Sequence, residues 1–241
     1  MGIPNAAQLL ALWEQGVDLP LPRKALLLLA AACPESSGDE LAGLSLGRRD
    51  ALLRELRERF FGSAIKLIAP CPACNETLET ELCLGDLGLE APAIGEQTLT
   101  IDGYQIAFRL LAAGDLLDLP DDPAEARLEL LSRCVIAVRD VEGVNALPRT
   151  LPESVIAALG EKLSQADPGA DLQFSLICPA CAHEWNSPFD ITMALWKEVQ
   201  AWAQRTLRDV HALARAYGWR ERDILALSPT RRQIYLELNL Q

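Results

Sequence analysis

The sequence predicts an α+β protein that is mainly α-helical, with a split four-cysteine zinc ribbon formed by two β-hairpins and a β-hairpin/helix insertion between them. Two observations support this. The tetrapeptide Cys-Pro-Ala-Cys occurs twice, at 71–74 and at 178–181, between stretches of alternating apolar residues. Apolar residues at helical spacing dominate the rest of the chain. Because 104 positions separate the two motifs, a shared site must join distant parts of the chain.

The two motifs are typical of zinc knuckles. A zinc ion takes four ligands in a tetrahedron, and each knuckle supplies two thiolates. Cys71, Cys74, Cys178 and Cys181 are therefore predicted to hold one structural Zn²⁺, with no open position for catalysis. The alternatives are ordinary buried thiols or a redox Cys-x-x-Cys, but a redox motif starts a helix and strands are expected here. His183 is a further candidate ligand, although a polar role in the knuckle is preferred.

The composition limits the classes of function. The chain has 241 residues, half of them hydrophobic, and a formal net charge of −12, which argues against binding to nucleic acid or to an anionic membrane. The three cysteines outside the knuckles lie in apolar surroundings, which favours a reducing compartment. The longest apolar run, 25–33, is too short to span a membrane, and the N-terminus has no basic signal-peptide region. We expect a soluble protein made inside the cell.

An N-terminal helical region is predicted over residues 1–64. Its helices are expected at 5–16, 23–33 and 46–61. The second is apolar nearly all round and should be buried. The third begins after Ser45, a good N-cap residue. Its charged outer face is expected to be solvated and to carry i,i+4 ion pairs, with a partner-binding patch as the alternative.

The ribbon itself is assigned to 65–84 and 174–190, and the insertion to 85–173. A Gly- and Pro-rich linker, 85–95, precedes a hairpin at 98–111, whose Asp102-Gly103 dipeptide suits a type I′ turn. Helices are predicted over 123–138 and over 152–166, the second with Pro152 in its first turn.

The last part, 191–241, is predicted to be a helical partner-docking region with helices at 192–217, at 220–227 and from Pro229 onward. Its candidate partner-binding residues are Trp196, Tyr217, Trp219, Arg231, Arg232 and Tyr235. Two interpretations of this tail stay open. It lies in a partner's groove, or it folds back as an antiparallel helix pair with aromatic packing at the bend.

Catalytic motifs are absent from the sequence. It contains no phosphate loop, no Gly-x-Gly-x-x-Gly, no Gly-x-Ser-x-Gly and no His-Glu-x-x-His, and its only histidines are His183 and His211. We expect that the protein is not an enzyme and has no catalytic residues, since no acid, base and nucleophile converge. An enzyme whose site is assembled from distant carboxylates is the remaining alternative of this class.

A nucleic-acid alternative comes from the tail. Residues 213–225 superficially resemble a helix-turn-helix, and 201–241 carry seven arginines against four acidic residues. The alternative function is therefore a zinc-ribbon nucleic-acid-binding or transcription-related adaptor. The acidic remainder of the chain argues against it, because phosphate contacts need a basic surface.

The order of several short motifs resembles a known family. They are Leu12-Trp13-Glu14, Gly47-Arg48-Arg49-Asp50, Phe61-Gly62, the two knuckles, Phe189-Asp190, Leu195-Trp196-x-Glu198, Val210-His211-x-Leu213-Ala214-x-x-Tyr217-Gly218-Trp219 and Ile224-Leu225-x-Leu227-Ser228-Pro229-x-Arg231-Arg232-x-x-Tyr235-Leu236. This order is similar to that of the baseplate (hub) protein family of contractile phage tails and phage-tail-like contractile injection systems, related to a T-even phage baseplate hub component.

The resemblance implies a non-enzymatic structural component or assembly factor of the baseplate hub. It also implies that baseplate hub or tape-measure proteins are the partners, and that the chain is present in the bacterial host cytoplasm during assembly or in the finished particle. It brings no catalytic residues. The neighbour, its copy number, and the choice between a phage and an injection system stay open.

Overall fold

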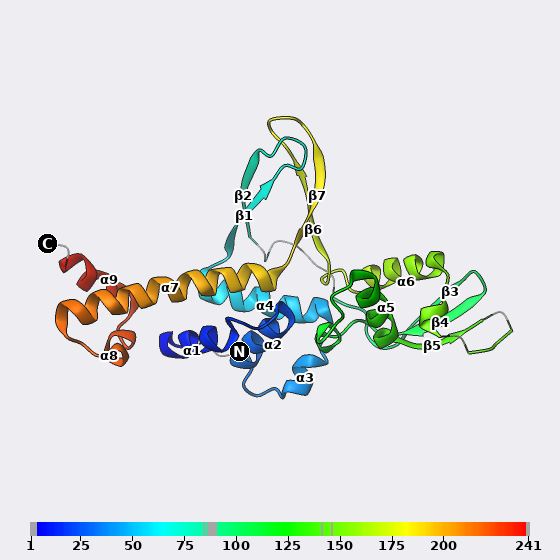
Figure 1. The fold of residues 1–241 in the computed structure, drawn as a ribbon, viewed down its shortest axis with the longest axis horizontal. Helices are drawn as coiled ribbons and strands as arrows, with labels where there is room; N and C mark the ends of the chain where they lie inside the picture. The colour runs from blue at the N-terminus through cyan, green and yellow to red at the C-terminus, as the bar shows by residue number, and fades with distance from the viewer. Residues whose placement is uncertain (1–3, 84, 86–90, 141, 146, 240–241) are drawn as a thin grey trace. The chain divides into compact units, whose positions relative to one another are not determined.

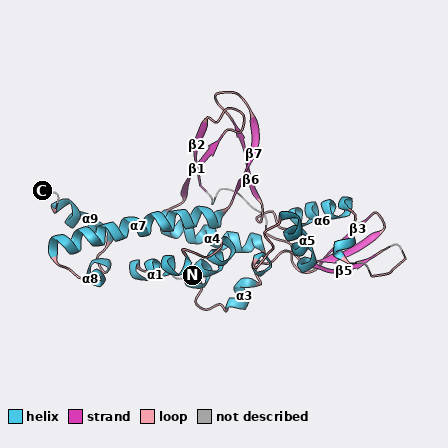
Figure 2. Cartoon of the chain, in the orientation of Figure 1, coloured by secondary structure: helices cyan, strands magenta, loops and turns pink. Residues whose placement is uncertain are grey.

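The computed structural model describes residues 4–83, 85, 91–140, 142–145 and 147–239. Helices and short antiparallel sheets occur together, which confirms the α+β class (Figures 1 and 2). The chain divides into two compact units, one of residues 36–191 and one of 1–35 with 192–241. The division of the chain into four parts that the sequence suggested stays a prediction. Leu84 and residues 86–90 of the expected linker lie outside the described residues.

The unit 36–191 contains the two knuckles. Its elements are α3 (Gly38–Ala42), α4 (Leu46–Phe61), β1 (Ala64–Pro70), β2 (Thr77–Cys83), β3 (Gln97–Ile101), β4 (Tyr104–Phe108), the 3-10 turn η2 (Ala113–Leu116), α5 (Pro123–Cys134), β5 (Val135–Arg139), the 3-10 turn η3 (Pro148–Thr150), α6 (Glu153–Ala166), β6 (Leu172–Ile177) and β7 (Glu184–Phe189). Its sheets are the hairpin β1–β2, the three-stranded sheet β3–β4–β5 and the hairpin β6–β7.

The inserted segment forms a small core of its own around the sheet β3–β4–β5. Ile106 and Phe108 of β4 are fully buried and pack with residues of α5 and α6, among them Leu131, Val155 and Leu159. Positive φ angles of 47° at Asp102 and 80° at Gly103 give the β3–β4 hairpin the type I′ turn predicted for it. The sequence therefore specified this hairpin and its register.

The helix predicted over 123–138 is wrong in its last four residues. The helix α5 ends at Cys134, and Val135–Arg139 continue as the strand β5, which pairs with β4 through Ala107 and Ala137. Val135, Ile136 and Val138 are β-branched, and their side chains fit a pleated surface better than a helix. The partner strand comes from a distant hairpin, so helical periodicity alone overextended the helix.

The charged face predicted for α4 is confirmed in part: Arg59 and Glu55 make the expected i,i+4 ion pair at 2.6 Å, but three of its charged residues are buried. Arg49, Asp50 and Arg57 are 7%, 8% and 2% exposed, where a solvated face was predicted. Arg49 Nε donates to Asp50 Oδ1 at 2.7 Å, and Arg57 donates to the carbonyl oxygen of Gly62 at 2.6 Å. Burial raises the pKa of Asp50 in spite of the Arg49 contact. These charges are tolerated because each finds a partner.

The start of α4 is tied to the turn before β6. Asp167 is buried, and its Oδ2 accepts from the backbone N–H of Gly47 at 2.9 Å, which places a carboxylate at a helix N-terminus. A Cβ atom at Gly47 would overlap the Asp167 carboxylate, and one at Gly169 would lie 3.2 Å from the Gly47 Cα. Glycine at both positions avoids these contacts, and the close approach helps to position the segment that leads into the second knuckle hairpin.

The unit of residues 1–35 and 192–241 is helical. Its elements are α1 (Ala6–Gly16), α2 (Leu21–Ala32), nearly all of α7 (Ile191–Tyr217), α8 (Glu221–Leu225) and α9 (Pro229–Leu238). Asn5 and Gln8 form a capping box at the start of α1. Trp196 of α7 packs so closely on Gly16 that a Cβ atom there would overlap its ring, and the Lys24 ammonium lies 5.0 Å from the Trp196 ring centroid.

The described part of the chain contains no helix that is both long enough and apolar enough to cross a bilayer.

An ion pair fastens the 3-10 turn η2 to the sheet and to α5. Arg109 donates to both carboxylate oxygens of Asp115, at 2.6 and 2.9 Å, and the backbone N–H of Ala112 donates to Oδ2 at 2.7 Å. Arg109 also donates to the carbonyl oxygen of Arg133 at 2.7 Å. Burial acts to raise the pKa of Asp115, but the Arg109 hydrogen bonds outweigh it and hold that pKa below its ordinary value of 3.8.

We expect Asp115→Asn to lower the free energy of unfolding at pH 7 by about 2 kcal/mol, because the variant loses charge-assisted hydrogen bonds to a partly exposed arginine. Because the folded-state pKa is lowered, the stabilisation is present above the unfolded-state pKa and is lost as pH falls through the folded-state value. Urea unfolding at pH 7 and at pH 3 measures this. The exposed carboxylate variant Asp121→Asn is the control, and equal stability of Asp115→Asn and wild type at pH 7 would contradict the assignment.

Candidate metal centre

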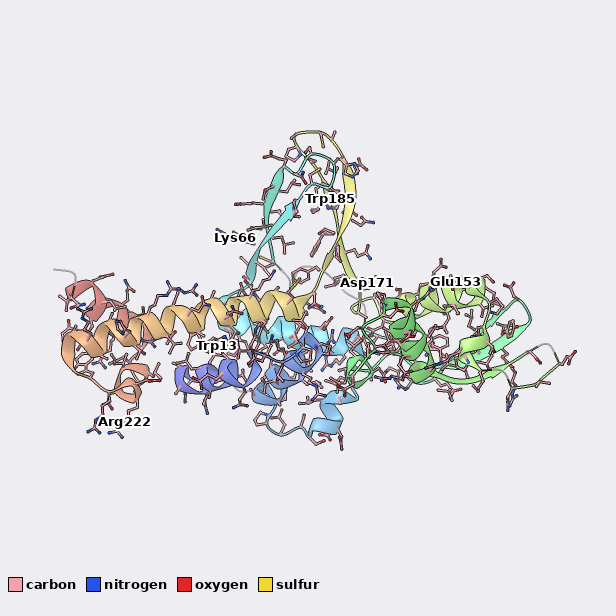
Figure 3. All side chains as sticks on the ribbon, in the orientation of Figure 1. Trp13, Lys66, Glu153, Asp171, Trp185 and Arg222 are labelled. Carbon is pink, nitrogen blue, oxygen red and sulfur yellow. The ribbon has the colours of Figure 1, made fainter. Side chains whose placement is uncertain are left out.

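The two knuckle hairpins are built alike. In β6–β7 the half-buried residues Leu176 and Trp185 pair across the hairpin, and Phe174 and Phe189 make an edge-on ring contact at 5.6 Å. In β1–β2, Ala69 pairs with Leu78. Each hairpin thus has one apolar face, and residues such as Lys66 project from the other (Figure 3). The alternation of apolar and polar residues with a period of two is the pattern that predicted these strands from the sequence.

The loops at the hairpin tips repeat the same backbone geometry. The N–H of Cys71 donates to the carbonyl of Glu76 at 2.8 Å, and the N–H of Cys178 donates to that of His183 at 2.9 Å. Four positions after each first cysteine the backbone is left-handed, with φ of 60° at Asn75 and 59° at Ala182. Asparagine tolerates this region, but alanine is strained in it.

The four knuckle thiols meet at one point. Their sulfur atoms all lie within 4.8 Å of one another. The Cys71 and Cys181 sulfurs are 3.7 Å apart, and those of Cys74 and Cys178 are 3.6 Å apart. A tetrahedron with zinc–sulfur bonds of about 2.3 Å has edges of about 3.8 Å. Each short contact joins the first cysteine of one knuckle to the second of the other, so neither hairpin has a complete site.

These distances exclude disulfides, whose sulfurs are bonded at about 2.05 Å, and all four cysteines are free. The redox alternative also loses support, because β2 and β7 follow the motifs where a redox motif would start a helix. His183 is exposed and stacks on Trp185 at 6.1 Å between ring centroids, while its backbone carbonyl accepts from Cys178. The cluster of potential ligands contains the four cysteines and not this histidine.

The thiols influence one another. Burial acts to raise the pKa of Cys71, but backbone N–H groups of Cys74 and Ala73 donate to its sulfur and lower that pKa to about 7. The backbone N–H of Glu76 acts to lower the pKa of Cys74, yet the neighbouring thiols raise it to about 12. Crowded thiols resist ionising together without a cation, and a bound cation removes that resistance. The donor set fits a soft divalent metal such as zinc.

The remaining cysteines lie outside the cluster. Cys33 and Cys134 are buried and Cys83 is half-buried. Burial raises the pKa of Cys134 to about 11, which keeps it protonated and inert.

The six predicted partner-binding residues differ in their exposure and packing. Trp196 and Arg232 are each 5% exposed, and Trp196 therefore packs inside its unit and offers little surface to a partner. Tyr217, Trp219 and Tyr235 pack on one another with ring centroids 4.7 to 5.9 Å apart, so the tail folds as the helix pair with aromatic packing. Arg231 is exposed on α9. Partner binding by these residues stays a prediction.

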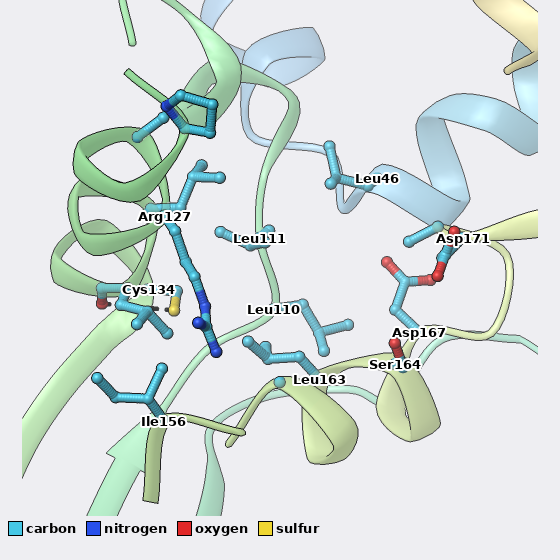
Figure 4. A pocket seen from close by; sticks show the side chains of 16 residues that line it. Leu46, Leu110, Leu111, Arg127, Cys134, Ile156, Leu163, Ser164, Asp167 and Asp171 are labelled. Carbon is cyan, nitrogen blue, oxygen red and sulfur yellow. Dashed lines mark hydrogen bonds between the residues drawn. The ribbon is translucent and has the colours of Figure 1, made fainter. Parts of the chain in front are cut away.

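Sequence reasoning missed an apolar cavity of about 520 Å³ between α5 and α6. Figure 4 shows Leu110 and Leu163 among its lining, with Arg127 on one side and Asp167 on the other. Gly160, which has no side chain, leaves room on α6. A glycine inside a helical pattern is the one feature of the sequence that could have indicated this cavity.

Residues 22–193 match the family described as T4 bacteriophage base plate protein. The chain belongs to this family. The match covers more than two thirds of the sequence and includes both knuckles, and it confirms the family resemblance. It begins after the Leu12-Trp13-Glu14 motif and ends before Leu195, so that motif and all the motifs from Leu195 onward lie outside the matched range. Comparisons with curated proteins and with solved structures found no match.

We expect Ala182→Gly to raise the free energy of unfolding by about 0.5–1 kcal/mol, because glycine relieves the left-handed strain at this position. Ala180→Gly in the same loop is the matched control, since Ala180 has no positive φ, and it should be neutral or slightly destabilising. Thermal unfolding of both variants measures the difference. Equal effects of the two substitutions would contradict the loop geometry.

Proposed function

We propose that this chain is a non-enzymatic structural component or assembly factor of the baseplate hub of a contractile tail or injection system. In this proposal a structural Zn²⁺ on Cys71, Cys74, Cys178 and Cys181 completes a split zinc ribbon. The C-terminal helical region docks hub or tape-measure proteins. The observation that carries the proposal is the convergence of four sulfur atoms from two hairpins, in a chain that belongs to a baseplate family.

A metal at this point has a mechanical role. The cysteines lie at hairpin tips 104 positions apart, so one ion closes a long loop of chain that includes the whole inserted segment. Isolated two-stranded hairpins are marginally stable in water, and metal ligation supplies what their small apolar faces lack. Four protein ligands fill a tetrahedral zinc site, which supports a structural role and not a catalytic one.

Membership of a structural baseplate family supports an interaction with other tail components, in the host cell during assembly or in the particle. It also favours this proposal over the zinc-ribbon nucleic-acid adaptor and over an enzyme. The net charge of −12 also argues against nucleic-acid binding, because an acidic surface repels phosphate.

The metal site predicts about one zinc per chain. Cys74→Ser and Cys178→Ser should each remove the metal and lower Tm by roughly 10 °C or more, because each opens the same long-range closure. Elemental analysis and thermal melts measure this. Cys83→Ser, which changes a half-buried thiol outside the cluster, should keep zinc and Tm. Metal-free wild-type protein, or a Cys74→Ser/Cys178→Ser variant that melts like its parent, would reject the closure.

The docking region predicts that a chain without residues 219–241 keeps its zinc but no longer captures hub or tape-measure proteins. The truncation removes α8 and α9 and leaves both knuckle hairpins in place. Pull-down from the native assembly with mass spectrometry, alongside the full chain, gives the comparison. Capture of the same proteins by the truncated chain would move the interface elsewhere.

A further inference from the structure

Helices α7 and α9 line a half-open polar groove of about 470 Å³ that neither the metal centre nor the matched family range includes. Trp202, Arg205 and Asp209 share one face of α7 at helical spacing, Arg208 flanks them, and Arg232 enters from the first half of α9. We call these five residues the arginine pocket. All of them belong to the unit that contains the C-terminal helices.

Arg232 is a charged side chain without an adequate acceptor. The residue is 5% exposed, its Nε atom is buried with no hydrogen-bond partner, and its one described side-chain bond is a long contact of 3.5 Å from a terminal nitrogen to the carbonyl of Leu227. In the described residues no carboxylate lies within ion-pair distance of Arg205, Arg208 or Arg232. Burying a guanidinium in this way is unfavourable unless an anion completes it.

The local charge favours an anion. Among the described residues that line the pocket, three are arginines and only Asp209 has a carboxylate, in a chain whose net charge is strongly negative. Burial raises the pKa of Asp209, although the three arginines act to lower it. The N-terminal end of α9, with Pro229 at its first position, adds the positive end of a helix dipole to the same cavity.

The chemistry of the walls selects among anions. A guanidinium presents paired N–H groups that match a carboxylate through two parallel hydrogen bonds. Trp202 gives the cavity an apolar wall beside the arginines, against which a short methylene stem can pack. A glutamate side chain has both parts. A nucleic-acid backbone would instead bring a row of phosphates toward an acidic protein, which is unfavourable.

We propose that the arginine pocket binds glutamate side chains of an acidic segment on a protein neighbour in the baseplate. This inference deepens the proposed function and rests on its docking role for the C-terminal helices. It assigns the partner's chemistry, and it moves the contact from the aromatic residues at the helix bend to the groove between α7 and α9.

The test is fluorescence anisotropy with a fluorescein-labelled hexaglutamate peptide at low salt, using the full chain. Arg205→Gln/Arg208→Gln changes two exposed arginines of the pocket and should weaken binding at least tenfold. Arg215→Gln/Arg222→Gln is the charge-matched control. Arg215 lies outside the pocket, and Arg222, on α8, has a side chain that is 74% exposed (Figure 3). The control should bind the peptide within about twofold of wild type. Arg232→Lys should weaken binding, because an ammonium group lacks the paired N–H donors of a guanidinium.

The proposal is overturned if wild type does not bind the peptide, if both double variants weaken it equally, or if hexathymidylate binds more tightly than hexaglutamate. Zinc content and pull-down of tail proteins are measured on the same samples, so the two proposals can fail separately. Loss of peptide binding with partner capture intact removes only the pocket assignment. Peptide binding without any capture of hub or tape-measure proteins removes the proposed function.

Discussion

The structure depends on the meeting of two pairs of thiols that are distant in the chain. Each pair lies on a two-stranded hairpin, which is marginally stable by itself, and each hairpin contributes only two of the four clustered thiols. The short sulfur contacts run between the hairpins, from Cys71 to Cys181 and from Cys74 to Cys178. The tips of the two hairpins that flank the insertion are therefore close together, and the sheet and helices of the insertion form a core of their own.

A second contact holds together the two segments that lead to the knuckle hairpins. The buried Asp167 accepts from the N–H of Gly47, and the glycine at 169 lets the turn after α6 approach the start of α4. Gly47 opens the Gly-Arg-Arg-Asp motif that marks the family resemblance, so its presence there has a physical cause. A side chain at this position would separate the two segments that lead to the knuckles.

Much of this arrangement follows from local sequence. The repeated tetrapeptide specified the hairpin tips, Asp102-Gly103 specified a type I′ turn, and Ser45 specified the start of α4. The failures share one physical cause. The strand β5 forms because β4 offers it a partner, and Arg49, Asp50 and Arg57 are buried because tertiary packing covers their side of α4. Likewise the arginines of α7 line a pocket only because α9 packs beside them. The spacing of residues within one helix cannot predict that contact.

The long interval between the knuckles has a consequence for the timing of synthesis. A ribosome that adds about 5–20 residues per second needs roughly 5–20 s to make the 104 positions between Cys74 and Cys178. During that time the first hairpin has been made, but only two of the four clustered thiols exist. A nascent chain in this state is exposed to other thiol-binding metals and to pairing with the same hairpin of a neighbouring chain on the polysome. The inserted segment has its own core, and its sheet and helices all precede the second knuckle in the chain, so their order of synthesis allows them to form before Cys178 is added.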